Sequence, residues 1–98
     1  MKKLITKVEQ WANDKGILSK ATPMKQALKT QEECLELLNA IEDNDILEIK
    51  DAIGDITVTL IIQCKMKGID FEECLQGAYD IISNRTGKMV NGQFVKDK

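Results

Sequence analysis

Apolar residues recur every three or four positions through most of the chain, which is the spacing of one face of an α-helix. The first such segment, residues 3–15, predicts a helix that stops at Gly16. After an expected loop from Gly16 to Ala21, Thr22 and Pro23 supply an N-cap and a first-turn proline for a second helix. This helix should run to about Ile41 and bury a stripe formed by Met24, Ala27, Leu28, Gln31, Cys34, Leu35, Leu38 and Ile41.

Two further helices are predicted in the second half of the chain. The third should have Asn44 or Asp45 as its N-cap, span residues 46–67 and end at Gly68. The fourth should follow the N-cap Asp70 and span about residues 71–85, with Gly87 ending it or lying just past its end. The run at residues 56–62 is apolar almost all round. Its β-branched residues also suit a strand, but the positions before it keep helical spacing and favour a helix. A helix apolar on every side needs partners on every side, so we expect other subunits to supply some of them.

A short hairpin or extended tail is expected after the fourth helix. Residues 89–95 carry the pair Asn91-Gly92 between short alternating segments, which is the strongest local signal for a hairpin turn. A chain of 98 residues is of a length typical of one domain, here residues 1–98. We therefore predict an all-α fold: a four-helix-bundle-like protomer with a short C-terminal hairpin or extended tail, assembling as a homodimer or homotetramer.

Composition narrows the class of protein. With 43% hydrophobic and 31% charged residues, the sequence fits a globular chain, and its net charge of −2 argues against nucleic acid or a membrane as partner. The absence of His excludes histidine bases and disfavours a di-iron bundle. The three cysteines form no C-x-x-C motif, and we interpret them as reduced core residues of a cytoplasmic protein. The N-terminal segment lacks the apolar run of a signal peptide.

Two sets of carboxylates are the chemistry that stands out from this pattern. Each set falls on one face of a predicted helix: Glu32, Glu33 and Glu36 on the second, and Glu48, Asp51 and Asp55 on the third. On a solvated face such charges would have little consequence. In a groove between packed helices they would repel strongly, and Mg²⁺, or alternatively Mn²⁺, would relieve the repulsion. Such a cation would also suit phosphate chemistry.

Other residues could complete a phosphate site, although each has an ordinary alternative. Trp11 is either a core aromatic or the wall of a pocket for a flat ligand, and Gln26 is either a solvated amide or a ligand to a base or sugar. Basic residues that could contact phosphate, or could be plain surface charges, are Lys25, Lys29, Arg85 and Lys88.

Several motifs fall in a characteristic order along the chain. They are Trp11-Ala12-x-x-Lys15-Gly16-Ile17-Leu18, Thr22-Pro23-x-x-Gln26-x-x-Lys29-x-x-Glu32-Glu33-x-x-Glu36, Asp51-Ala52-Ile53-Gly54-Asp55, Asn84-Arg85-x-Gly87-Lys88 and Asn91-Gly92. This order resembles the all-α nucleoside triphosphate pyrophosphohydrolases of the MazG-like group, whose signature is E-E-x-x-E, a gap, and E-x-x-D. The last two segments resemble those of small stand-alone members of phage or bacterial type.

The resemblance implies a helical bundle that assembles as a dimer or tetramer. It implies Mg²⁺-dependent hydrolysis of an NTP or dNTP between the α- and β-phosphates, giving the monophosphate and pyrophosphate. Carried over to this sequence, Glu33 and Glu36 would be metal ligands, Glu32 a ligand or the residue that activates water, and Asp55 the terminal acid. Candidate substrate contacts are Trp11, Gln26, Lys29, Asn84, Arg85 and Lys88.

One position departs from the family signature. The residue three before Asp55 is Ala52 rather than Glu, and the neighbouring Asp51 is the candidate to replace it as a metal ligand. A literal E-x-x-D also occurs at Glu48 to Asp51, but this choice leaves Asp55 without a role. The rival hypothesis is therefore a non-catalytic helical module that binds a nucleotide or a partner through a degenerate metal site.

Overall fold

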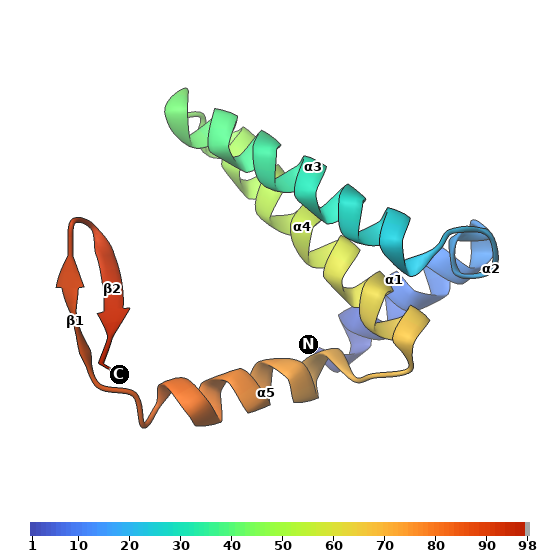
Figure 1. The fold of residues 1–98 in the computed structure, drawn as a ribbon. Coiled ribbons are helices and arrows are strands. Elements are labelled where there is room, and N and C mark those ends of the chain that lie inside the picture. Colours follow the sequence, from blue (N-terminus) through green and yellow to red (C-terminus); the bar gives the residue numbers. More distant parts are fainter. Residues whose placement is uncertain (98) are drawn as a thin grey trace.

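The computed structural model describes residues 1–97, which contain five helices followed by a two-stranded hairpin (Figure 1). A mostly helical fold with a C-terminal hairpin is therefore confirmed. Within these residues, no helix has both the length and the apolar character needed to cross a membrane. In chain order the elements are α1 (Lys2–Asp14), α2 (Ile17–Lys20), α3 (Pro23–Glu42), α4 (Ile46–Lys67), α5 (Phe71–Ile82), β1 (Gly87–Val90) and β2 (Gln93–Lys96).

The long helices α3 and α4 lie side by side at the centre of the fold, joined by a short turn (Figure 1). Their ends follow the predicted capping residues. Thr22 Oγ1 accepts a hydrogen bond from Lys25 N at 3.2 Å, and Asp45 Oδ1 accepts one from Glu48 N at 3.2 Å. α4 ends where Gly68 adopts a φ of 68°, in the left-handed region that glycine enters without steric cost.

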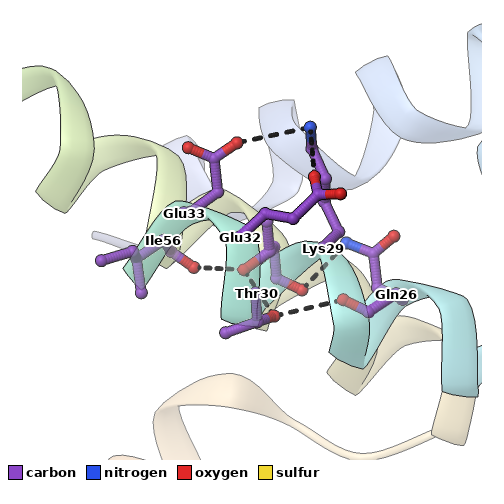
Figure 2. A network of polar contacts seen from close by, with 7 residues as sticks. Gln26, Lys29, Thr30, Glu32, Glu33 and Ile56 are labelled. Carbon is purple, nitrogen blue, oxygen red and sulfur yellow. Dashed lines mark hydrogen bonds and ion pairs between the residues drawn. The ribbon is translucent and has the colours of Figure 1, made fainter. Parts of the chain in front are cut away.

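A buried polar network connects α3 to α4 (Figure 2). Thr30 Oγ1 donates to Thr59 Oγ1 at 2.8 Å, and Thr59 Oγ1 donates to the Ile56 carbonyl at 2.7 Å. Gln26 Nε2 donates to the Thr59 carbonyl at 3.3 Å. Gln26 and Thr59 are both buried, so these bonds satisfy groups that would otherwise be costly to remove from water. The network therefore favours one register of α3 along α4.

The segment between the first two predicted helices is not a plain loop. Gly16 adopts a φ of 76° and reverses the chain after α1, and a single helical turn, α2, follows. Two backbone bonds close this turn: Lys20 N donates to the Gly16 carbonyl at 3.0 Å, and Ala21 N donates to the Ile17 carbonyl at 2.9 Å. One turn contains too few residues to show a helical period, which explains why the pattern did not predict it. α1 and α2 both pack against α4.

The fourth predicted helix, α5, is shorter than expected. It ends at Ile82 rather than near Arg85, and Gly87, expected at the helix end or just past it, is the first residue of β1. The predicted hairpin is confirmed: β1 and β2 pair in antiparallel fashion around the Asn91-Gly92 turn. Both turn residues have positive φ, 50° and 82°, as a tight hairpin turn requires. α5 contacts the end of α4, and the hairpin stands apart from α3 and α4 (Figure 1).

The expected buried stripe on α3 is wrong, because all eight of its residues are exposed. The face of α3 that meets α4 instead contributes Gln26, Glu33 and Ala40, which recur at seven-residue spacing. The apolar flank is left open, with Leu35 58% and Leu38 63% exposed. Likewise, Cys34 and Cys74 are exposed, and among the three cysteines only Cys64 is the core residue that we expected.

The chain is extended for its size. Its radius of gyration is 15.8 Å, whereas a compact domain of about 100 residues has about 13 Å. α5 contributes to this value, since none of its residues within 71–82 is buried. The predicted four long helices are present, but within the described chain they do not close into a bundle around one core (Figure 1).

Candidate functional site

Three carboxylates from the two central helices converge at one point. Glu33 and Glu36 of α3 and Asp55 of α4 each offer an oxygen atom, and these oxygens lie within 4.8 Å of one another. Glu33 is only 8% exposed, whereas Glu36 and Asp55 are exposed. Glu33 is held there because it occupies the face of α3 that packs against α4. The two acidic faces that the sequence predicted therefore do meet, through these three residues, which we call the acidic cluster.

Lys29 is the cation beside the acidic cluster (Figure 2). Its Nζ lies 3.4 Å from Glu33 Oε1 and 3.4 Å from Glu32 Oε2. The hydrogen bonds that Lys29 donates to Glu33 and Glu32 raise the pKa of its ammonium group, and the attraction of both carboxylates adds to this effect. Lys29 neutralises only part of the negative charge, because Glu36 and Asp55 have no ion pair among residues 1–97.

The neighbouring carboxylates affect the pKa of Glu36. The pKa of Glu36 is raised, first because its protonated form can donate a hydrogen bond to Glu33, and further because the charge of Glu33 repels its ionised form. Desolvation and the charge of Asp55 act in the same direction, and Lys29 opposes them. Protonation of Glu36 would therefore relieve part of the repulsion that a cation at the cluster would relieve.

The acidic cluster fits a hard divalent cation. Glu33 Oε2 is buried and has no hydrogen-bond partner among the described residues, so this oxygen lacks the partner that a cation would supply. The donor atoms are all carboxylate oxygens, the ligand type that Mg²⁺ and Mn²⁺ prefer, with neither sulfur nor imidazole in the set.

Two of the expected metal ligands lie outside the acidic cluster. The Glu32 side chain is 69% exposed and turns toward Lys29. Asp51 is exposed, whereas the neighbouring Ala52 is only 4% exposed and faces the packed side of α4. Adjacent residues of a helix point about 100° apart, so Asp51 does not project in the direction that a side chain at position 52 takes. Glu48 lies in a separate hollow at the α3–α4 turn, together with Glu36.

A pocket of about 480 Å³ opens beside the acidic cluster, and Glu33 and Asp55 form part of its wall. The remaining wall is mainly apolar, and Trp11 of α1, 48% exposed, lies along it. Gln26 also lines the pocket while its Nε2 is engaged by Thr59. The lining residues are Trp11, Ile17, Ala21, Lys25, Gln26, Lys29, Glu33, Asp55, Val58, Thr59 and Ile62.

Three of the candidate substrate contacts are not brought to this pocket within the described chain. Asn84 lies just beyond α5, where its Nδ2 donates to the Asp80 carbonyl at 3.2 Å. Arg85 precedes the hairpin and Lys88 lies in β1, and all three residues are exposed. α5 and the hairpin lead away from the α3–α4 pair (Figure 1), so these side chains belong to a separate region of the protomer.

Sequence reasoning missed three residues that line the pocket, namely Val58, Thr59 and Ile62. It also missed the bond from Thr30 to Thr59, which joins α3 to α4 near Glu33. A usable signal existed at Thr59, one of two threonines in the mainly apolar run 56–62 and one helical turn after Asp55. A hydroxyl at such a position needs a partner, and the facing helix is where one would be found.

Comparison with known proteins identifies a relative and a family for this chain. A protein of Haemophilus phage HP1 (strain HP1c1), described as an uncharacterized 18.2 kDa protein in the rep-hol intergenic region, is 40% identical over 70 residues. The matched segment is 71% of this chain and 43% of the phage protein, so the match spans less than half of that relative. No solved structure matches the chain. Residues 21–90 match the family described as the MazG nucleotide pyrophosphohydrolase domain, and the chain therefore belongs to this family.

Proposed function

We propose that this protein hydrolyses a nucleoside triphosphate, ribo- or deoxyribo-, to the monophosphate and pyrophosphate in a reaction that depends on Mg²⁺, with Mn²⁺ as the alternative ion. The observation that carries the proposal is the acidic cluster beside the pocket. Glu33 and Asp55 belong to both, so a cation held by these carboxylates would stand next to a bound ligand. Membership of the MazG family supports the coarse class of reaction.

Each residue of the acidic cluster has a role in the proposal. Glu33, Glu36 and Asp55 would hold the cation, which when bound supplies charge stabilisation at the phosphates and a more acidic water. Glu32 lies outside this set, and it would accept a proton from the attacking water once Lys29 has turned away from it. Lys29, now shared between Glu32 and Glu33, would turn one of its N–H bonds toward a phosphate oxygen. Asp51 remains a candidate for an outer position, through water.

The nucleoside would occupy the mainly apolar part of the pocket. Trp11 offers an aromatic face there, against which a base can stack. Gln26 is fixed by the bond from its Nε2 to the Thr59 carbonyl, while its Oε1 accepts no hydrogen bond among the described residues. This oxygen is therefore available to accept a hydrogen bond from the base or sugar.

A second copy of the chain would complete the assembly. The exposed apolar flank of α3, including Leu28, Leu35 and Leu38, is the surface that a homodimer or homotetramer would cover. Asn84, Arg85 and Lys88 could then approach a neighbour's pocket, since they do not reach their own. Light scattering after size exclusion tests this assembly: a dimer or tetramer is expected, and Leu35→Glu should reduce its mass to that of the monomer.

The alternative is a module that binds a nucleotide without hydrolysing it. This alternative is favoured by Ala52, because the expected acid is replaced by a buried methyl group and Asp51 points elsewhere. It predicts a rise in melting temperature with Mg²⁺ and nucleotide but no formation of product.

Product analysis separates the two functions. The pure protein is incubated with Mg²⁺ or Mn²⁺ and each canonical NTP and dNTP, and monophosphate and pyrophosphate are measured. Hydrolysis should be abolished in Glu33→Gln and Asp55→Asn and retained in Glu42→Gln, an exposed carboxylate at the end of the same helix. Turnover that survives in Glu33→Gln and Asp55→Asn would remove these residues from their assigned roles.

A further inference from the structure

Two of the three thiols face each other across a helix junction remote from the acidic cluster. Cys64 Sγ and Cys74 Sγ are 4.0 Å apart. Cys64 lies near the end of α4, and Cys74 lies in the first turns of α5. Gly68 reverses the chain between them with a φ of 68°, which sets the two thiols opposite each other.

The remaining gap between these sulfur atoms is small. A disulfide has an S–S length of about 2.05 Å, so the sulfur atoms must approach by about 2 Å. A change of χ1 rotamer at one cysteine moves its Sγ by about 2–3 Å, which is enough. α5 can also adjust, because none of its residues within 71–82 is buried and it packs mainly on the end of α4. Asp70 caps α5 through bonds to Glu72 N and Glu73 N, so the helix can shift without losing its first turn.

The two thiols differ in access, and this difference gives them an order of reaction. Cys74 is exposed and is the thiol that an oxidant in solution meets first. Cys64 is buried, with 8% exposure, and can react only with a group already close to it. Cys34 is exposed on α3 and has no thiol beside it among the described residues. Among the described residues, Cys64 and Cys74 are therefore the two cysteines placed to react with each other.

We propose that Cys64 and Cys74 form a reversible intramolecular disulfide with glutathione disulfide as oxidant, a modification site that ties α5 to α4. In the first step the Cys74 thiolate attacks one sulfur of glutathione disulfide, which forms a mixed disulfide and releases one glutathione thiolate. In the second step the Cys64 thiolate attacks Cys74 Sγ and releases the second glutathione. The two cysteines lose two electrons and two protons, and the oxidant becomes two glutathione molecules.

The consequence is a change in the freedom of the C-terminal arm, residues 71–97. In the reduced protein the arm is attached by the connection at Gly68 and by the contacts of α5 with α4. In the oxidised protein a covalent link near the start of α5 fixes its direction. This inference does not depend on the proposed hydrolysis, because neither cysteine lines the pocket beside the acidic cluster.

The test uses the full chain and glutathione disulfide. The Cys34→Ser variant gives the cleanest readout, because exposed Cys34 would itself react with glutathione disulfide. In this variant the thiols titrated after denaturation should fall from two to none, intact mass should fall by two hydrogen atoms, and dithiothreitol should reverse both changes. A peptide map should show Cys64 joined to Cys74 in this variant and in the parent. Cys64→Ala in the Cys34→Ser background should stop at a glutathione adduct on Cys74.

Two results would overturn the proposal. One is a stable glutathione adduct on Cys74 of the parent protein while Cys64 remains open to alkylation. The other is a disulfide between two chains, through Cys34 or Cys74, in place of the internal bond. If Cys64→Ala fails to fold, Cys74→Ser in the Cys34→Ser background serves instead, since position 74 is exposed: Cys64 should then remain a free thiol.

Discussion

The substitution Glu33→Gln distinguishes a metal site from an ordinary acidic helix face. At a metal site it should stabilise the protein when no cation is present and destabilise it, relative to the parent, when Mg²⁺ is bound. In the metal-free protein Glu33 is a buried carboxylate with one unpartnered oxygen and with Asp55 Oδ within 4.8 Å. An amide at position 33 keeps the shape, removes the charge and can donate an N–H bond to a neighbouring carboxylate. In EDTA the variant should therefore be more stable than the parent protein.

The size of this gain follows from the geometry. Two unit charges 4.8 Å apart repel by about 3.5 kcal/mol at an effective dielectric of about 20, and by about 0.9 kcal/mol in water. Asp55 is exposed, so the lower figure applies to its pair with Glu33. A partner for the buried atom adds about 1 kcal/mol, and the weakened ion pair with Lys29, half exposed, subtracts about 0.5 kcal/mol. The net gain is about 1.4 kcal/mol, or roughly 6–11 °C in melting temperature for a domain of this size.

Addition of Mg²⁺ should reverse the order. A cation at about 100 times its dissociation constant stabilises the parent by about 2.7 kcal/mol, and the variant, which has lost one of three ligands, should gain much less. The assay is thermal unfolding in EDTA and in Mg²⁺ at one fixed protein concentration, with Glu42→Gln as the matched control. A variant that is less stable than the parent in EDTA, or that gains as much from Mg²⁺, would refute the assignment of Glu33.

Further predictions concern Glu36, Thr59 and Cys64. Because the pKa of Glu36 is raised, protons should compete with the cation, and Mg²⁺ affinity should begin to weaken on acidification above the ordinary carboxyl range of about pH 4. Titration calorimetry at several pH values measures this affinity. An affinity that does not change with pH would contradict the prediction. In EDTA, Glu36 should stabilise the folded protein at pH values below its ordinary pKa. This contribution should be lost as pH rises through its raised pKa. Thr59→Val removes the hydroxyl that links Thr30 to the Ile56 carbonyl and should cost about 1 kcal/mol in urea unfolding, whereas an unchanged midpoint would deny the network any role in stability. Burial raises the pKa of the Cys64 thiol to about 11, with contributions from Cys74, Asp70 and Glu9. Closure of the disulfide from the glutathione adduct should therefore accelerate about tenfold per pH unit between about pH 7 and 9. Alkylation of samples quenched at successive times measures this rate, and a rate independent of pH would exclude Cys64 as the attacking thiol.

Local signals in the sequence were sufficient for the ends of the long helices. Thr22, Asp45 and Gly68 act through their own side chains or backbone conformation, so their effect does not depend on what packs nearby. The same holds for Asn91-Gly92, whose positive φ values define the hairpin turn. The single turn α2 escaped prediction because four residues cannot show a period.

The faces of the helices were harder to assign than their ends. On α3 the apolar stripe that includes Leu35 and Leu38 was expected to be the inner face, yet the chain packs Glu33 and Gln26 against α4. Periodicity identifies a face that seeks a partner, but it does not say whether that partner belongs to the same chain. An apolar flank left exposed in one chain is consistent with a second copy as its partner.

The candidate site was predicted in part for a related reason. The spacing of Glu33, Glu36 and Asp55 placed them on faces that could meet, and their oxygens do converge. Asp51 was predicted to join these ligands because it is next to Ala52 in the sequence. Side chains of adjacent helical residues, however, point about 100° apart. Asn84 and Arg85 depend on where α5 leads, which no local pattern defines.

The most direct test of the account is the identity of the products formed from a nucleoside triphosphate in the presence of Mg²⁺. Chromatography of the reaction should show monophosphate and pyrophosphate in equal amounts, with no turnover in EDTA and none in Glu33→Gln. Diphosphate with orthophosphate, or hydrolysis that continues in EDTA, would contradict the assignment of the acidic cluster as the metal-holding centre of a pyrophosphohydrolase.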